Sequence, residues 1–130
     1  MSKTKWMASA FLALATTVMA ADLDLSDFDD STMRSMGDAI KELDSNIGGQ
    51  EKDRALENTT VLRDGLTWAE KYFSDKPEAP RGVEFARMSR EQLTQLVDSL
   101  QASNFDVAAG KVRELAKACK TCHQAYKPPE

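Results

Sequence analysis

The sequence predicts an all-α protein, an antiparallel up-down-up-down four-helix bundle, and three observations lead to this prediction. Apolar residues recur at intervals of three and four, as they do on one face of a helix, and show no convincing two-residue alternation. Glycine, proline or a capping residue separates the segments that carry this pattern. The connections are short, so successive helices should lie antiparallel around one core.

The first two predicted helices each end at a helix-breaking stretch. Gly48-Gly49 ends the first one. Residues 74–80 contain two prolines and end the second one. The first apolar face comprises Met33, Met36, Ile40, Leu43 and Ile47, and the second comprises Ala55, Thr59, Leu62, Leu66, Ala69 and Phe73.

The third predicted helix has two candidate starts. Pro80 suits a first helical turn. Residues 89–92 read as a capping box, which would give a later start. Its apolar face comprises Phe85, Met88, Leu93, Leu96, Val97 and Leu100.

The fourth predicted helix has the most regular pattern of the four. Asn104 is its candidate N-cap, and Pro128-Pro129 ends it. Its apolar face comprises Phe105, Ala108, Val112, Leu115, Cys119, Cys122 and Tyr126.

Residues 1–20 have the pattern of a secretory signal peptide. Lys3 and Lys5 precede a mostly apolar run, and Val18-Met19-Ala20 is typical of a cleavage site. Cleavage would leave a mature domain of residues 21–130, exported to the periplasm. An uncleaved membrane anchor is the alternative. No later stretch is apolar enough for a membrane helix, so we expect no stable membrane insertion after cleavage.

The segment Cys119-Lys120-Thr121-Cys122-His123 is a C-x-x-C-H motif, the attachment signature of c-type haem. Helix positions three and four residues apart share a face. Both cysteines can therefore bond one edge of a haem, and His123 can turn beneath the ring to bind iron. The motif and the signal peptide together predict one covalently bound haem c per chain.

Three other interpretations of the two cysteines remain. A redox-active pair would normally lie at a helix N-terminus, whereas this pair lies near a C-terminus. A structural zinc site needs a fourth ligand, which would have to be a distant carboxylate. A disulfide closing so short a loop would stabilise the chain little.

The second iron ligand is not fixed by spacing. His123 is the only histidine, which excludes two histidine ligands from one chain. The remaining side-chain candidates after signal removal are Met33, Met36 and Met88. A methionine ligand raises the reduction potential and suits an electron carrier. Core packing is the ordinary role of a methionine, and an open sixth site would suit gas binding.

The residues resemble those of the superfamily that contains cytochrome b562 and the class II cytochromes c, including cytochrome c′. The stretch from Gly110 to Lys127 is similar to the haem-binding last helix of this group. Met33-Arg34-Ser35-Met36-Gly37 matches a Met-x-x-Met-Gly pattern whose first methionine is the usual ligand. The resemblance therefore implies that Met33 and His123 are the axial ligands. It also implies haem packing for Phe85, and Met36 is a further packing candidate.

This chain departs from the class II pattern at Asp29. An arginine often stands at that position, four residues before the ligand. The connection between the second and third helices is also shorter than is usual in cytochrome c′.

Charge restricts the class of partner. The full chain has a net charge of −4, and the signal peptide holds two of its 17 basic residues and none of its 21 acidic ones. An acidic mature chain argues against nucleic acid. It is compatible with docking to a basic patch on a redox partner, although solubility alone explains the charge.

Three functions follow as hypotheses. The first is a periplasmic one-electron carrier with His123 and Met33 on the iron, and the second is a cytochrome c′-like protein whose open site binds small gases such as nitric oxide. The third is a non-haem helical protein. No arrangement suggests substrate turnover, so we do not expect an enzyme. Monomer and homodimer remain open.

Overall fold

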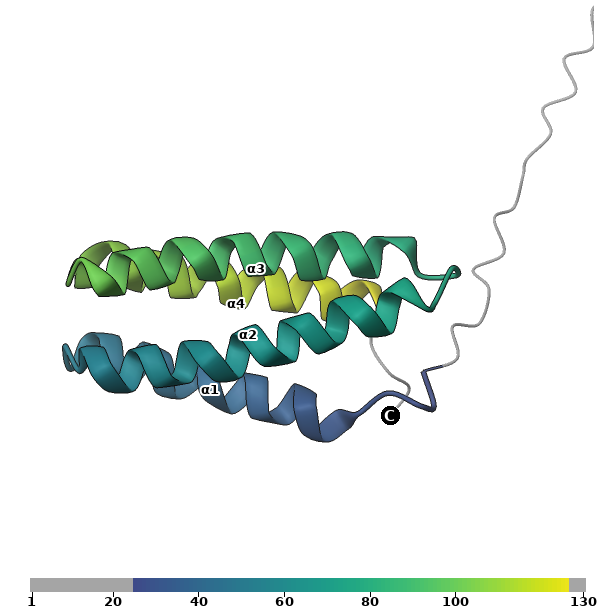
Figure 1. Ribbon diagram of the computed structural model, residues 1–130, viewed down its shortest axis with the longest axis horizontal. Helices are drawn as coiled ribbons and strands as arrows, with labels where there is room; N and C mark the ends of the chain where they lie inside the picture. The colour runs from purple at the N-terminus through teal and green to yellow at the C-terminus, as the bar shows by residue number, and fades with distance from the viewer. Residues whose placement is uncertain (1–24, 127–130) are drawn as a thin grey trace, which may run out of the picture.

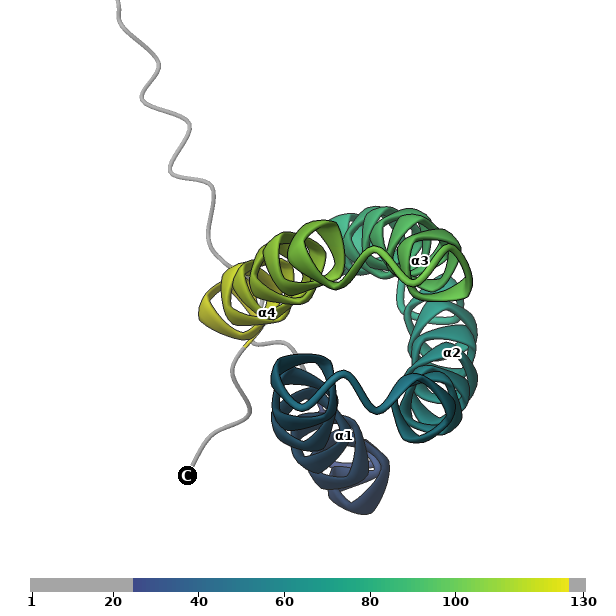
Figure 2. The same ribbon diagram turned by 90° about the vertical axis from the view of Figure 1, so that its left-hand side faces the viewer.

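The computed structural model describes residues 25–126, which form four helices and, within that range, no strand (Figure 1). They are α1 (Asp30–Gly48), α2 (Lys52–Ser74), α3 (Pro80–Gln101) and α4 (Phe105–Ala125). The chain runs up and down through successive helices, and the end-on view shows them in order around a common axis (Figure 2). The predicted all-α four-helix bundle is confirmed. The predicted signal peptide, residues 1–20, and Pro128-Pro129 lie outside the described residues.

Side-chain caps explain where two of the helices begin. The Asp29 carboxylate accepts hydrogen bonds from the backbone N–H of Ser31 at 2.9 Å and of Thr32 at 3.4 Å, so Asp29 is the N-cap of α1. The Asn104 side chain accepts one from the backbone N–H of Val107 at 3.3 Å, as predicted for the N-cap of α4. These bonds satisfy N–H groups that have no partner within the helix.

Two other predicted boundaries are settled by the structure. α1 ends at Gly48, and Gly49 is its C-cap, as the glycine pair predicts. α3 begins at Pro80, which confirms the earlier of its two candidate starts. The capping-box interpretation of residues 89–92 is wrong, because Ser89 is buried in the middle of α3.

The core runs along the bundle axis and is built mainly from leucine. Each of these side chains contributes roughly 1.5–3 kcal/mol when it is fully removed from water. One predicted core position is wrong: Met88 is 47% exposed. The buried face of α3 passes through Ala86 and Ser89, and a helix turns by about 100° per residue, which directs Met88 outward. The largest fully buried side chains are Leu43, Leu62, Leu96, Leu100, Leu115 and Val112.

The first helix is less closely joined to the last helix than to the second. α1 packs extensively on α2 and much less on α4. It also separates from its neighbours toward its N-terminal end, where the ribbon is purple (Figure 1). None of the helices in residues 25–126 is long and apolar enough to cross a membrane.

Candidate functional site

A cavity of about 300 Å³ lies where α1 diverges, and all four helices contribute to its wall. Its volume falls at the lower end of the range for ligand sites, about 300–1,000 Å³. Apolar side chains such as Leu62, Leu66 and Phe73 form most of the wall. The structure brings every site residue predicted from the sequence to this cavity: Met33, Met36, Phe85, Cys119, Cys122 and His123.

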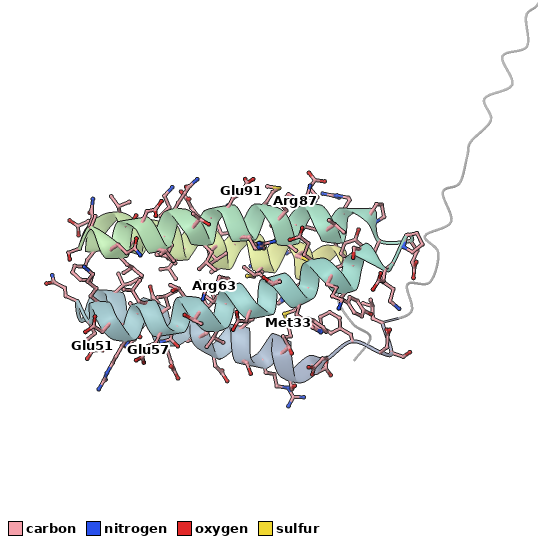
Figure 3. All side chains as sticks on the ribbon, in the orientation of Figure 1. Met33, Glu51, Glu57, Arg63, Arg87 and Glu91 are labelled. Carbon is pink, nitrogen blue, oxygen red and sulfur yellow. The ribbon has the colours of Figure 1, made fainter. Side chains whose placement is uncertain are left out.

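The two predicted iron ligands are in direct contact with each other in the wall of the cavity. The Sδ atom of Met33 lies 3.3 Å from Nε2 of His123. Met33 projects from the first turns of α1, at the diverging end that Figure 3 marks, and His123 projects from the last turn of α4. The other methionine candidates do not share this position. Met36 is buried further along α1, and Met88 lies on the outer surface of α3.

The two cysteines lie on the same wall as His123. Cys119 and Cys122 are half-buried free thiols three residues apart on α4. Burial raises the pKa of Cys119. Burial, and then the nearby Cys119, raise the pKa of Cys122 to about 11. Both shifts disfavour the thiolate, which is the form that reacts in thiol–disulfide exchange.

The zinc interpretation also lacks ligands in this part of the chain. Among residues 25–126, no group of three histidine, cysteine, aspartate or glutamate side chains is arranged to hold a metal ion. Asp30 lines a neighbouring cavity with Cys122 and His123, but no carboxylate of the described residues is placed to complete a structural zinc site with the motif.

Two glycines that sequence reasoning missed allow side chains to enter the site. A Cβ on Gly65 would lie 2.4 Å from Sδ of Met36, and a Cβ on Gly82 would lie 2.3 Å from the ring of Phe73. Each glycine thus lets a neighbouring side chain pack directly against the backbone of a helix. The available signal was a glycine inside a helical pattern, which often marks close packing.

Ser89 is a second residue whose role the sequence did not reveal. It is only 3% exposed and forms part of the cavity wall from α3. The sequence suggested a capping role for it. In the structure it places a hydroxyl group in the mostly apolar wall of the cavity.

The segment before α1 closes the end of the bundle. The Asp27 carboxylate accepts hydrogen bonds from the Tyr72 hydroxyl at 2.8 Å and from Nζ of Lys76 at 3.0 Å. These contacts, that of Lys76 first, lower the pKa of Asp27. Phe28 packs edge-on against Trp68 and Tyr72, with ring centroids 5.0 Å apart in both pairs. A further cavity of about 350 Å³ lies beneath this segment, beside Met33, Cys122 and His123.

The donor set and the wall fit a covalently bound haem. A neutral imidazole nitrogen and a thioether are a known axial pair for haem iron, and both cysteines lie on the helix that carries the imidazole. The present separation of 3.3 Å is shorter than two metal–ligand bonds of about 2 Å each, taking zinc as a guide. Binding of one iron by both side chains would therefore require a separation about 1 Å greater than this, taking the metal–nitrogen and metal–sulfur bonds of zinc as a guide.

Comparison of the chain with protein-family models, with curated proteins and with solved structures gave no match.

Proposed function

We propose that this chain is an exported c-type cytochrome that carries one haem and transfers single electrons. Cys119 and Cys122 would hold the haem covalently, and His123 and Met33 would bind its iron. The observation that carries the proposal is the approach of Met33 to His123 in a cavity that both cysteines line. Residues 90 positions apart meet there with the donor atoms that an electron-transfer haem uses.

The haem would supply the chemistry, a one-electron change at iron, and the chain would control its surroundings. The helices of the bundle fix the two donor atoms. Leu62, Leu66 and Phe73 exclude water from the wall of the cavity. Phe85 offers its ring as a packing surface from α3, and Met36 fills the space left by Gly65. A packed apolar wall of this kind would limit rearrangement when the charge of the iron changes.

The cellular part of the proposal depends on the sequence. The signal-peptide pattern of residues 1–20 supports export to the periplasm, where covalent attachment retains the cofactor. The partners would be other redox proteins rather than nucleic acid, and no substrate turnover is proposed.

Expression in cells that mature c-type cytochromes tests the proposal. We expect the mass of the mature chain to increase by that of one haem, with loss of this mass when both cysteines are replaced by serine. We expect a low-spin spectrum in both oxidation states, with methionine-to-iron charge transfer in the ferric form. A chain that acquires no haem in such cells would overturn the assignment.

A gas-binding cytochrome is the second candidate, and one observation favours it. Met33 lies in the first turns of α1, where helix ends are least stable, and the 350 Å³ cavity beside it offers space for a small ligand. In that case Met33 would pack without binding iron. A high-spin spectrum, with rapid carbon monoxide binding to the ferrous protein, would replace electron transfer with gas binding.

A further inference from the structure

Basic residues gather on the second half of α4, beside the candidate haem site. From Lys111 to Tyr126 the helix has four basic residues and one acidic residue, Glu114. Residues 25–126 as a whole contain 14 basic and 18 acidic residues, so this stretch has a charge of the opposite sign to its surroundings. The four basic residues are Lys111, Arg113, Lys117 and Lys120.

Two lysines bring this positive charge to the mouth of the cavity. Lys41 on α1 and Lys120 on α4 are both exposed, and both line the cavity that holds Met33 and His123. The Lys41 ammonium lies 3.9 Å from the Asp38 carboxylate, and both side chains are more than 70% exposed. Such a solvated pair contributes little. Within the described part of the chain, Lys120 and Lys117 form no ion pair.

The basic residues of α2 and α3 are arranged differently. Arg54 pairs with Glu51, and both Arg87 and Arg90 pair with Glu70. Figure 3 shows Arg63 on α2 and Arg87 on α3, and neither residue lines the cavity that holds Met33 and His123. Lys52, Lys71 and Arg81 form no ion pair among the described residues, yet α2 and α3 each hold as many acidic as basic residues, whereas α4 holds four basic and two acidic residues. Net positive charge is therefore concentrated on α4, beside the cavity mouth.

We propose that the face formed by Lys41, Lys117 and Lys120 is the docking surface for an acidic redox protein. The proposal deepens the function proposed above and rests on it. The net charge of the mature chain alone would favour a basic partner. Local charges prevail at contact distance, because screening reduces the influence of charges beyond about 10 Å at 0.1 M ionic strength. A partner with a carboxylate-rich surface would thus be steered to the side where the haem edge opens.

Small redox reagents of opposite charge test the sign of this face in the haem-loaded protein. Oxidation of the ferrous form is followed with ferricyanide, a trivalent anion, and with tris(phenanthroline)cobalt(III), a trivalent cation. Ionic strength is varied from about 0.02 to 0.5 M, over which the screening length falls from roughly 20 Å to roughly 4 Å. We expect the rate with ferricyanide to fall as salt rises, although the protein is acidic.

Charge-reversal variants locate the effect. Lys41→Glu and Lys120→Glu should each slow the ferricyanide reaction by about three- to tenfold at low salt and accelerate the cobalt reaction. Arg54→Glu changes the net charge equally at the far end of the bundle, and its effect should stay under about twofold. Lys120 lies inside the attachment motif, so Lys41→Glu keeps the test valid if haem attachment to the Lys120 variant fails.

A reduced acidic flavodoxin serves as the protein probe. The rate of electron transfer from the flavodoxin to the ferric protein should be affected by the three variants in the same order as the ferricyanide rate. It should also fall as the salt concentration rises. Equal effects from all three variants would overturn the proposal, because net charge alone would then govern the rate. A shift in reduction potential with unchanged salt dependence would also overturn it, since the lysines would then pair with the carboxylates of the haem.

Two further outcomes distinguish a failure of the docking proposal from a failure of the proposed function. Lysine-dependent sedimentation with phosphatidylserine vesicles, without a flavodoxin effect, would assign the face to a lipid surface and overturn protein docking. Absence of a haem spectrum would instead refute the proposed function before any rate is measured.

Discussion

Sδ of Met33 and Nε2 of His123 lie 3.3 Å apart, although the two residues are 90 positions apart in the chain. If both bind iron, Met33→Leu removes the thioether while nearly preserving volume. We expect loss of the methionine-to-iron charge-transfer band and a fall in reduction potential of order 100 mV, within the span of about 0.8 V that axial ligation covers. Absorption spectra and a redox titration of the purified protein measure both effects.

Met36→Leu is the matched control for that substitution. Met36 is buried on the same helix and lines the same cavity, but its sulfur lies beside Gly65. The charge-transfer band should therefore remain in this variant. Retention of the band in Met33→Leu together with its loss in Met36→Leu would reverse the assignment of the ligand.

The contact between Gly65 and Met36 predicts an unusual response to alanine. Alanine in a helix interior normally stabilises by about 0.5–1 kcal/mol relative to glycine. A Cβ on Gly65 would lie 2.4 Å from the Met36 side chain. Gly65→Ala should therefore lower the free energy of unfolding by about 1–3 kcal/mol, as measured by urea denaturation.

Gly110→Ala provides the contrast, because its added Cβ meets nothing within 4 Å. It should stabilise the protein by the ordinary amount for a helix. Shortening Met36 to alanine in the Gly65→Ala background should recover part of the loss, which a double-mutant cycle detects. Additive effects would show that the two side chains do not conflict.

The N-cap of α1 predicts a dependence of stability on pH. Bonds from Ser31 and then Thr32 lower the pKa of Asp29 from 3.8 to about 2. A group whose pKa is lower in the folded state stabilises the fold above its unfolded pKa, and this contribution disappears as pH falls from about 4 to about 2. Asp29→Ala should lower the melting temperature at neutral pH and reduce its pH dependence in that window.

Asp29→Asn separates the cap from its charge. Asparagine is a good N-cap residue and does not ionise. This variant should keep most of the stability at neutral pH and lose the dependence between pH 4 and about 2, as thermal melting followed by circular dichroism would show. A wild-type pH profile in this variant would mean that another carboxylate causes the dependence.

The contacts of Asp27 predict local protection of the segment before α1. The network lowers the pKa of Asp27 and raises that of Lys76. Burial, and then the bond to Asp27, raise the pKa of Tyr72. The contribution of the network is complete at neutral pH. It is lost at low pH, where Asp27 binds a proton, and at high pH, where Tyr72 and Lys76 lose theirs. Tyr72→Phe should accelerate amide hydrogen exchange at Phe28 near neutral pH and leave exchange at Leu96 unchanged.

Periodicity predicted the four helices well because burial on one face dominates their energetics. The positions of Leu43, Leu62, Leu96 and Leu115 follow from spacing alone. Met88 did not follow, because spacing does not define the edge of a buried face to within one residue. Local chemistry also placed the caps at Gly49 and Asn104, whose partners lie within a few residues.

In the site as well, features that depend on nearby residues were predicted from the sequence, and features that depend on distant residues were not. The C-x-x-C-H motif lies within five residues, so the sequence alone was enough to predict haem attachment there. Three other features depend on residues from another helix, which the sequence does not place. They are the packing of Met36 against Gly65, the burial of Ser89 and the contacts of Asp27. The positive face at the cavity mouth likewise appears only when α1 is placed beside α4.

The divergence of α1 gives the proposed iron site a second consequence. A haem bonded to α4 and coordinated by Met33 would act as a reversible cross-link between the two ends of the folded chain. A link that closes so long a loop removes much of the freedom of the unfolded state. Breaking the iron–sulfur bond alone would then release α1, the helix that packs least on α4, before the rest of the bundle opens.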